Sequence, residues 1–196
     1  MARFVPLAGV LLVAAIACCW RPWLQLRRHG TWGIILFRSA SRGQLLRDAL
    51  MVVLFVLLLG QAALVAVSSE EVAPSLMQVA GAIVMLGGIA LLVAAQLDLG
   101  ASWRIGIDEG AKPGLVTGGL YRFCRNPIFL ALMIIVAGYA LLLPTRLSLV
   151  LLAATIIGVS QQARAEEAYL LDTYGESYRE YARRVGRFLP GTGKLS

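Results

Sequence analysis

The sequence predicts an all-α membrane protein with five transmembrane helices and a cytosolic amphipathic helix near the C-terminus. Three observations lead to this fold class: 59% of the 196 residues are hydrophobic, the mean hydropathy is +0.76, and the apolar residues gather into five separate runs. A bilayer core of ~30 Å needs about 20 apolar residues per helix. The runs are residues 4–20, 49–68, 76–97, 128–143 and 147–163. We expect residues 1–196 to form a single membrane-integral domain in which residues 164–196 are a cytosolic tail.

The first run, residues 4–20, is expected to be a retained membrane span. It leads into Trp20-Arg21-Pro22-Trp23 and then Arg27-Arg28, and aromatic residues followed by basic residues are typical of a span end. The alternative is a signal peptide, cleaved or carrying a lipid on Cys18, because a basic residue, an apolar stretch and small residues precede that cysteine.

The second and third runs, residues 49–68 and 76–97, are long enough to cross the bilayer unaided. The preceding loop contains an apolar segment, residues 32–37, that is too short to span. It is expected to lie at the inner interface or to pack on the bundle. The third run carries small residues that allow close helix packing. These are Gly81, Gly87, Gly88, Ala90 and Ala94.

The fourth and fifth runs, residues 128–143 and 147–163, predict an antiparallel hairpin because only Pro144-Thr145-Arg146 separates them. Pro144 cannot continue a helix interior, so the fourth helix should end there. Both runs are short for a span, and continuation beyond the membrane core is therefore expected. The fifth run has neither Pro nor Gly between Ser160 and Thr173, which predicts a helix that continues to Gly175.

The tail contains a tyrosine stripe. Tyr174, Tyr178, Tyr181 and Val185 are spaced i, i+4, i+7 and i+11, so they share one face if the backbone there is helical. This pattern predicts an amphipathic helix that folds back under the bundle, either as an interfacial anchor or as a lid over a bound ligand.

The distribution of basic residues predicts the orientation. The loop 21–48 contains six arginines, the loop 98–127 four basic residues and the tail from Arg164 six, whereas the loop 69–75 contains two glutamates and no base. The positive-inside rule therefore places the N-terminus outside and the C-terminus in the cytosol, in the inner membrane if the protein is bacterial. Topology and anionic membrane lipids explain the net charge of +7, and a nucleic-acid partner is not expected.

Histidine and cysteine usage excludes the commonest metal sites. His29 is the only histidine, and Cys18 and Cys19 are adjacent within an apolar run while Cys124 is isolated. Neither metal-ligand spacing nor a disulfide framework follows from these positions. Cys124 is expected to be an inert thiol, although the arginines beside it could lower its pKa.

The first candidate site precedes the fourth span. Pro127 suits the first turn of a helix, and the unpaired N–H groups of that turn favour an anion such as a carboxylate. Arg125 adds a cation, Tyr121 a hydroxyl and Asn126 an amide. The alternative is that Arg122 and Arg125 only set the topology.

The second candidate site is the pair Glu166-Glu167 at the inner end of the fifth span. Carboxylates near a membrane boundary are unfavourable unless they are paired or hydrated, and they are often functional. Arg125, Arg164 and Arg187 are available as partners. The alternative is an ion-paired helix exit without a chemical role.

Together these segments resemble the isoprenylcysteine carboxyl methyltransferase family, which is related to the phospholipid N-methyltransferases. The resemblance covers roughly residues 96–190, in order. The matching motifs are Gly119-Leu120-Tyr121, Arg125-Asn126-Pro127-Ile128-Phe129, Glu166-Glu167-Ala168-Tyr169-Leu170, Tyr174-Gly175, Tyr178-Arg179-Glu180-Tyr181 and Val185 to Pro190.

The resemblance implies a methyltransferase that uses S-adenosyl-L-methionine as cofactor and methylates a lipophilic or small hydrophobic acceptor, a carboxylate, an amine or a thiol. It implies catalytic roles for Glu167 and Arg164. The cofactor-binding residues that it implies are Tyr121, Arg125, Asn126, Pro127, Glu166, Glu167, Tyr178, Tyr181 and Arg187.

Two departures from the family pattern concern the acceptor. Asn126 stands where the motif has a histidine, which keeps hydrogen bonding but removes a titratable group. The arginine that family members carry about one turn before the glutamate pair is matched only by the nearby Arg164. Two other functions stay open: a non-enzymatic membrane scaffold, and an NADPH enzyme like the sterol reductases, whose chains are much longer.

Overall fold

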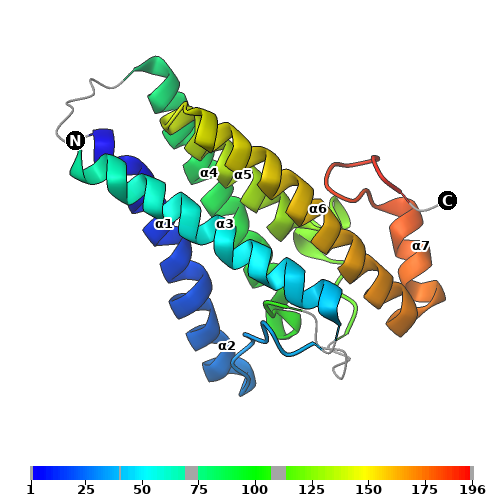
Figure 1. Ribbon diagram of the computed structural model, residues 1–196. Coiled ribbons are helices and arrows are strands. Elements are labelled where there is room, and N and C mark those ends of the chain that lie inside the picture. Colours follow the sequence, from blue (N-terminus) through cyan, green and yellow to red (C-terminus); the bar gives the residue numbers. More distant parts are fainter. Residues whose placement is uncertain (1, 40, 69–74, 107–113, 195–196) are drawn as a thin grey trace.

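The computed structural model describes residues 2–39, 41–68, 75–106 and 114–194 as a bundle of helices (Figure 1). Its α-helices are α1 (Val5–Ala14), α2 (Arg21–His29), α3 (Arg42–Val67), α4 (Leu76–Leu99), α5 (Pro127–Leu142), α6 (Arg146–Tyr174) and α7 (Glu176–Arg184). The turns η1 (Ala2–Phe4), η3 (Gly100–Ser102) and η4 (Gly119–Arg122) are 3₁₀-helices, and η2 (Ala15–Trp20) is a π-helix. No β-strand occurs in these ranges, only two isolated bridges.

The all-α membrane fold predicted from the sequence is confirmed. Four continuous helices are long and apolar enough to cross a bilayer: Val5–His29, Arg42–Val67, Leu76–Ser102 and Arg146–Tyr174. The fifth, α5, has 16 residues, or about 24 Å at 1.5 Å per residue, and is slightly short of the hydrocarbon core. The protein is therefore an integral membrane protein.

Helices α4 and α5 pack closely along their length, and glycines bring them close together. A Cβ atom added to Gly81 would lie 2.8 Å from the carbonyl oxygen of Gly138, and one added to Gly88 would lie 2.9 Å from the backbone nitrogen of Ile135. A Cβ added to Gly87 would meet nothing within 4 Å. Of these glycines in the third run, Gly81 and Gly88 thus serve the close packing, and Gly87 does not.

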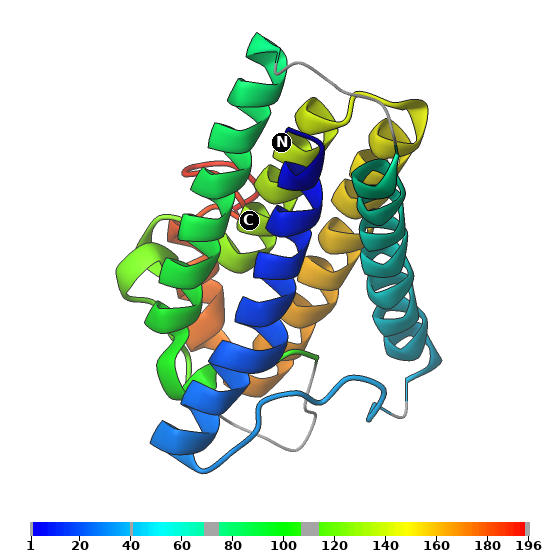
Figure 2. The same cartoon turned by 90° about the vertical axis from the view of Figure 1, so that its left-hand side faces the viewer.

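Helix α6 packs on α5, α3 packs on α6, and α1 contacts α3, α4 and α5. Figure 2 shows α1 in front of the bundle, between α4 and α3. Tyr139 of α5 donates a hydrogen bond to the carbonyl oxygen of Leu58 on α3 (3.0 Å), and Gln61 of α3 donates to Ser148 of α6 (3.0 Å). These buried polar contacts tie α3 to the α5–α6 hairpin at the end where the hairpin turns.

The first helix is longer than its apolar run, and Pro22 explains the π-helical turn within it. The helix continues through α2 to His29, where Gly30 ends it with a φ of 70°. Pro22 lacks an N–H group and its ring clashes with a carbonyl one turn earlier. The preceding turn widens to π geometry, and the N–H of Arg21 donates to the carbonyl of Ile16, five residues back. The helix thus passes the proline without breaking.

Buried arginine contacts hold α2 to the end of α4. Arg21 is only 2% exposed, and it donates to the carbonyl oxygens of Gln96 (3.2 Å) and Gly100 (2.7 Å). Its guanidinium lies 4.7 Å from the centroid of the Trp103 ring. The apolar segment 32–37 follows α2, and Ile35 pairs with Ile105 through a backbone hydrogen bond of 3.0 Å, so the segment packs on the bundle.

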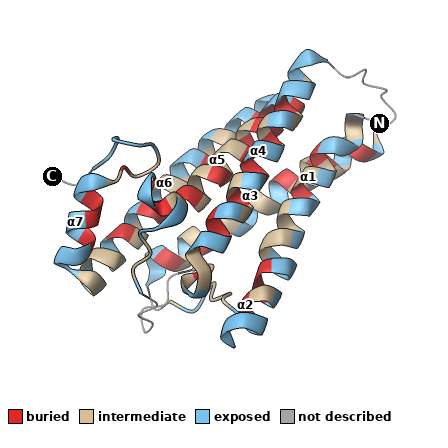
Figure 3. Ribbon diagram, turned by 180° about the vertical axis from the view of Figure 1, so that it is seen from behind, coloured by how far each residue is buried: buried red, intermediate tan, exposed pale blue. Residues whose placement is uncertain are grey.

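The C-terminal part places α7 beside the end of α6. Helix α6 continues to Tyr174, as its sequence predicts, and Gly175 with a φ of 54° ends it. Helix α7 then turns back along α6 (Figure 1). Tyr178 and Tyr181 are buried against the bundle, and buried positions recur along α7 in Figure 3. The tyrosine stripe therefore faces inward, although Gly175 interrupts the helix within it.

Candidate functional site

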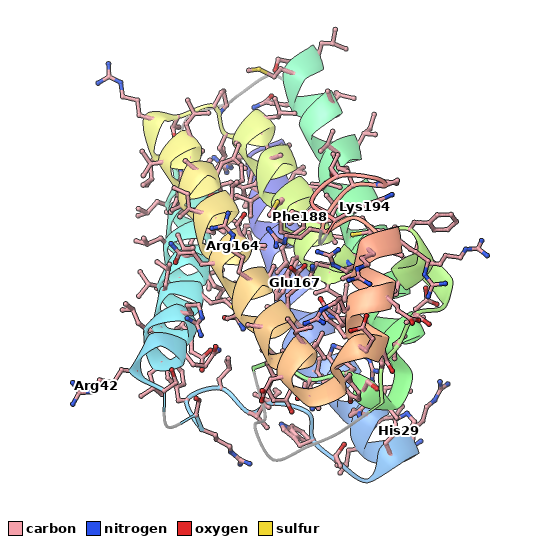
Figure 4. The ribbon with its side chains drawn as sticks, turned by 90° about the vertical axis from the view of Figure 1, so that its right-hand side faces the viewer. His29, Arg42, Arg164, Glu167, Phe188 and Lys194 are labelled. Carbon is pink, nitrogen blue, oxygen red and sulfur yellow. The ribbon has the colours of Figure 1, made fainter. Side chains whose placement is uncertain are left out.

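The two candidate sites meet at Glu167. Arg125 donates to the Oε1 atom of Glu167 from Nε (3.2 Å) and Nη2 (3.0 Å), and their side chains are 1% and 7% exposed. Figure 4 shows Glu167 where α6 faces α7 and the C-terminal segment. Two residues that are 42 positions apart thus form a buried ion pair at the end of the α5–α6 hairpin opposite its turn.

Arg125 uses all of its donors within the chain. Its remaining hydrogen bonds go to backbone carbonyl oxygens of the tail: Nη1 donates to Ala182 (2.8 Å) and Val185 (2.6 Å), and Nη2 donates to Gly193 (2.9 Å). A guanidinium has five N–H donors, and all five are engaged here. Arg125 therefore fixes the tail against the membrane helices and has no donor left for a ligand.

Asn126 and Arg187 complete the coordination of Glu167. The Nδ2 atom of Asn126 donates to Oε1 (2.9 Å), and Arg187 donates to Oε2 from Nε (2.9 Å) and Nη2 (2.8 Å). Both carboxylate oxygens are therefore occupied. The pKa of Arg187 is raised, chiefly because its guanidinium donates to Glu167. We call Arg125, Asn126, Glu167 and Arg187 the latch.

Backbone pairing supports the latch. The N–H of Arg125 donates to the carbonyl of Gly186 (2.9 Å), and the N–H of Asn126 donates to that of Arg187 (3.1 Å). The turn that follows requires glycine at position 186, because an added Cβ would collide with the carbonyl oxygen of Leu189. The thiol of Cys124 lies in the same contact, and burial raises its pKa.

Three buried tyrosines line the contact between η4 and α7. Tyr181 donates its hydroxyl to the carbonyl oxygen of Tyr121 (2.6 Å). The hydroxyl of Tyr178 is buried and has no hydrogen-bond partner among the residues that the structure describes. Burial raises the pKa of all three hydroxyls, so they stay protonated at neutral pH. Tyr178 is therefore an unused hydroxyl beside the latch.

Glu166 lies next to Glu167 in sequence but has different neighbours. Its Oε1 atom accepts one hydrogen bond, from Nε2 of Gln162 (3.1 Å), and its Oε2 atom has none from the described part of the chain. Successive residues of an α-helix point about 100° apart, so the two carboxylates face different directions. Glu166 is half-buried and lies near Arg47, Arg104 and Tyr121.

A chain of polar side chains from α3 supports Glu166. Arg47 donates from Nε to the Oε1 atom of Gln162 (3.0 Å) and from Nη2 to that of Gln44 (2.7 Å). Gln44 donates to Asp48 (2.6 Å), which also accepts from the N–H of Phe37 (2.8 Å). We call Gln44, Arg47, Asp48 and Gln162 the relay. Apart from Arg47, its members are at most 3% exposed.

The structure brings most of the predicted site residues together but leaves Arg164 apart. Tyr121, Arg125, Asn126, Pro127, Glu167, Tyr178, Tyr181 and Arg187 all belong to the contact between α5, α6 and the tail. Arg164 is exposed on α6 and makes no hydrogen bond or ion pair with any described residue (Figure 4). Its catalytic role stays a prediction, as do the roles of the other site residues.

Sequence reasoning missed the relay. Gln44, Arg47 and Asp48 stand in the loop-to-helix region before an apolar run, where polar residues are ordinary. Gln162 is 115 residues from Arg47, so no local spacing joins them. Asp48, an acid among the arginines of that loop and close to a membrane span, was the one available indication.

Comparison with known proteins identifies the family. Residues 76–177, just over half of the chain, match the sequence model of the phospholipid methyltransferase family. The chain is 37% identical over 82 residues to Methanethiol S-methyltransferase 1 of Bradyrhizobium diazoefficiens, which covers 42% of this chain and 28% of that protein. It is 34% identical over 77 residues to the protein-S-isoprenylcysteine O-methyltransferase of Schizosaccharomyces pombe, which covers 39% and 33%.

The fold is also similar to a solved structure. The eukaryotic intramembrane Ras methyltransferase ICMT (isoprenylcysteine carboxyl methyltransferase) matches 96% of this chain and 63% of its own, with a TM-score of 0.60 and 18% identity. At this identity the match shows a common fold. The sequence matches span only about a third of the two relatives' length. They nevertheless agree with the family that the two motifs predicted, and the chain belongs to the phospholipid methyltransferase family.

Proposed function

We propose that this protein is a membrane-integral methyltransferase that uses S-adenosyl-L-methionine and acts on a lipophilic or small hydrophobic acceptor at the cytosolic leaflet. The observation that carries the proposal is the latch, in which the two family motifs meet at Glu167. Family membership supports methyl transfer as the reaction, and both relatives are named methyltransferases.

The position of the site supports an acceptor that arrives from the membrane. Glu167 is about 30 Å along α6 from Arg146, roughly the thickness of the hydrocarbon core. The positive-inside rule assigns this end of the helix to the cytosol. The names of the two relatives specify methanethiol and isoprenylcysteine, one small and one lipophilic. We therefore expect the acceptor to enter from the inner leaflet.

The polar groups that remain around the latch fit the methyl donor. Two guanidinium groups face a single carboxylate, so the latch carries an excess positive charge. The Nη1 atom of Arg187 and the hydroxyl of Tyr178 have no hydrogen bond within the described part of the chain. These two groups suit the carboxylate of the donor's methionine part. When bound, the donor supplies a methyl group on a positively charged sulfur.

The residues of the chain would act mainly by positioning. A reaction between two held reactants gains most from correct orientation and exclusion of water. The latch would provide both, because Arg125 holds the tail over the inner end of α5 and α6. With both of its oxygens occupied, Glu167 would be a positioning residue for Arg125 and Arg187 rather than a proton acceptor. Arg164 would be available to a carboxylate acceptor.

The experiment is to titrate the purified full chain, in detergent or nanodiscs, with S-adenosyl-L-methionine by calorimetry. The protein is then incubated with the methyl-labelled donor and a membrane lipid extract. We expect binding and a labelled product, and Arg187→Ala should weaken the binding at least tenfold. Absence of both binding and product would overturn the proposal.

The same preparation tests the other two functions. Oxidation of NADPH without donor binding would favour a reductase. A scaffold should bind neither compound, and Glu167→Gln should then leave every measured property except stability unchanged.

A further inference from the structure

We infer that Glu166 is the residue that faces the acceptor, and that the acceptor carries a proton on the atom to be methylated, as a thiol or an amine does. The inference rests on the proposed function and makes it more specific. It starts from the difference between two consecutive carboxylates, only one of which has an unused oxygen.

Glu167 cannot serve a ligand without breaking the latch. Its two oxygens receive five N–H groups from Arg125, Asn126 and Arg187. Glu166 receives only the amide of Gln162, and its Oε2 atom is unbonded among the described residues. A proton acceptor needs an available lone pair within reach of the proton, and of the two residues Glu166 provides it.

The relay gives this carboxylate a fixed position. Arg47 donates to the Oε1 atom of Gln162, which orients the Gln162 amide so that its NH₂ group faces Glu166. Arg47 in turn donates to Gln44, and Gln44 donates to Asp48. Burying a polar chain of this length near a membrane boundary is costly unless it is fully hydrogen-bonded. The chain ends at Glu166, so its effect is to hold that carboxylate still.

The charges around Glu166 favour a protic acceptor over a carboxylate. The charged and titratable groups near it are Arg47 of α3, Arg104 after η3, Tyr121 of η4 and Glu167 of its own helix. None of them donates a hydrogen bond to its Oε2 atom within the described part of the chain, and the guanidinium of Arg104 lies 5.8 Å from the ring centroid of Tyr169. An acceptor carboxylate would meet the negative charge of Glu166, whereas an S–H or N–H group would find a proton acceptor.

In the transfer step the acceptor loses one proton and gains one methyl group. The acceptor proton passes to Oε2 of Glu166 as a lone pair of the acceptor sulfur or nitrogen forms the new bond to the methyl carbon. The bond from that carbon to the donor's sulfur breaks, and its electron pair neutralises the sulfur. The proton leaves Glu166 for cytosolic water. A thiol needs this assistance because its pKa rises in apolar surroundings, where little thiolate is present.

The test compares three probes of equal chain length in the same nanodiscs: decanethiol, decylamine and decanoic acid, each with methyl-labelled donor. The wild-type protein should methylate the thiol or the amine and leave the acid unmethylated. In Glu166→Gln, which keeps side-chain volume, kcat should fall at least 100-fold while the calorimetric Kd for the donor stays within twofold. The residual rate should rise about tenfold per pH unit, because the acceptor must now ionise unaided. Glu166→Asp should retain more activity than Glu166→Gln.

The matched control is Glu176→Gln, which changes an exposed glutamate of α7 and should leave every parameter at the wild-type value. Thermal unfolding of each variant shows whether the fold is kept. Methylation of decanoic acid alone or of no probe, an unchanged kcat in Glu166→Gln, or weaker donor binding in that variant would each overturn the inference. Only a wild-type protein that fails to bind the donor and yields no labelled product from the lipid extract overturns the proposed function as well.

Discussion

The two sides of α6 near its C-terminal end differ in how many hydrogen bonds their carboxylates accept. On the side that faces the tail, Glu167 receives five N–H donors, and all five donors of Arg125 are engaged. On the side that faces α3, Glu166 receives one donor at the end of the relay. The two carboxylates are chemically identical and adjacent in sequence. Their difference comes entirely from which segments pack against each face of the helix.

A fully satisfied buried network stabilises one arrangement of the chain, whereas an incompletely satisfied one leaves groups for a ligand. Within the latch, Glu167 and Arg125 therefore fit the first description, and the end of the relay fits the second. Four substitutions test this contrast, in order of decreasing expected effect.

Arg125→Ala should have the largest effect on stability. It removes five hydrogen bonds, three of which hold the tail, and we expect a loss of about 3 kcal/mol, because removing one partner of a buried ion pair leaves the other poorly compensated. Thermal unfolding in detergent should show a fall in Tm of roughly 5–10 °C. Arg179→Ala, which breaks an exposed ion pair of α7, should cost less than about 0.5 kcal/mol. Equal effects of the two would mean that the latch does not hold the tail.

Gln162→Leu should affect turnover rather than stability of the latch. It removes the only hydrogen bond that Glu166 accepts from the described residues, and it removes the bond between Arg47 and α6. Because misplacing a reacting group by about 1 Å can cost on the order of 100-fold, we expect kcat to fall 10- to 100-fold. The calorimetric Kd for the donor should stay within twofold. A weaker donor affinity with normal kcat would show that the two sides of α6 do not divide the work as we propose.

Cys124 can report whether the latch is closed. Its thiol is buried beside the carbonyl of Arg187, and burial raises its pKa, so little thiolate exists at neutral pH. In a Cys18→Ser/Cys19→Ser background, alkylation of the folded protein by a maleimide should be slow and should speed up as the pH rises. Adding Arg187→Ala should accelerate labelling several-fold, as the tail opens. Identical rates with and without Arg187 would contradict a closing role for that residue.

Arg164→Ala should have the smallest effect. Arg164 is exposed and unpaired with any residue of the described segments, so its loss should change Tm by less than about 1 °C. A protic acceptor makes no demand on this cation, and KM should change less than threefold. A large rise in KM for an acid probe would instead support the carboxylate clamp that the family resemblance implies.

Much of the fold could be predicted from hydropathy and from a few helix-breaking residues. In lipid the backbone N–H and C=O groups must bond to one another, so a long apolar run in this setting forms a helix. Pro144 and Gly175 mark the ends of α5 and α6 for the same local reasons in the sequence and in the structure. The start of α3 at Arg42 and the extension of α2 to His29 were not predicted, because polar residues continue a helix beyond the membrane without any change in hydropathy.

The sequence predicted which residues lie together in the site better than it predicted what each of them contacts. The sequence offered Arg125 and Arg187 as partners for the glutamate pair, and both contact Glu167. It could not indicate that the other donors of Arg125 end on backbone carbonyls, since carbonyls are present at every residue. It also gave no means of separating Glu166 from Glu167, because that distinction depends on α3, which packs on α6 only in the folded protein.

The partners of Arg125 also fix the order in which the site can be assembled. They lie 42, 57, 60 and 68 residues further along the chain. During synthesis, Arg125 and the start of α5 reach the membrane surface well before Gly193 has been translated. The arginine therefore stays hydrated while the α5–α6 hairpin inserts, and it is buried only after the tail has been synthesised and packs on it. Activity should therefore appear late, after the helices are already in the bilayer.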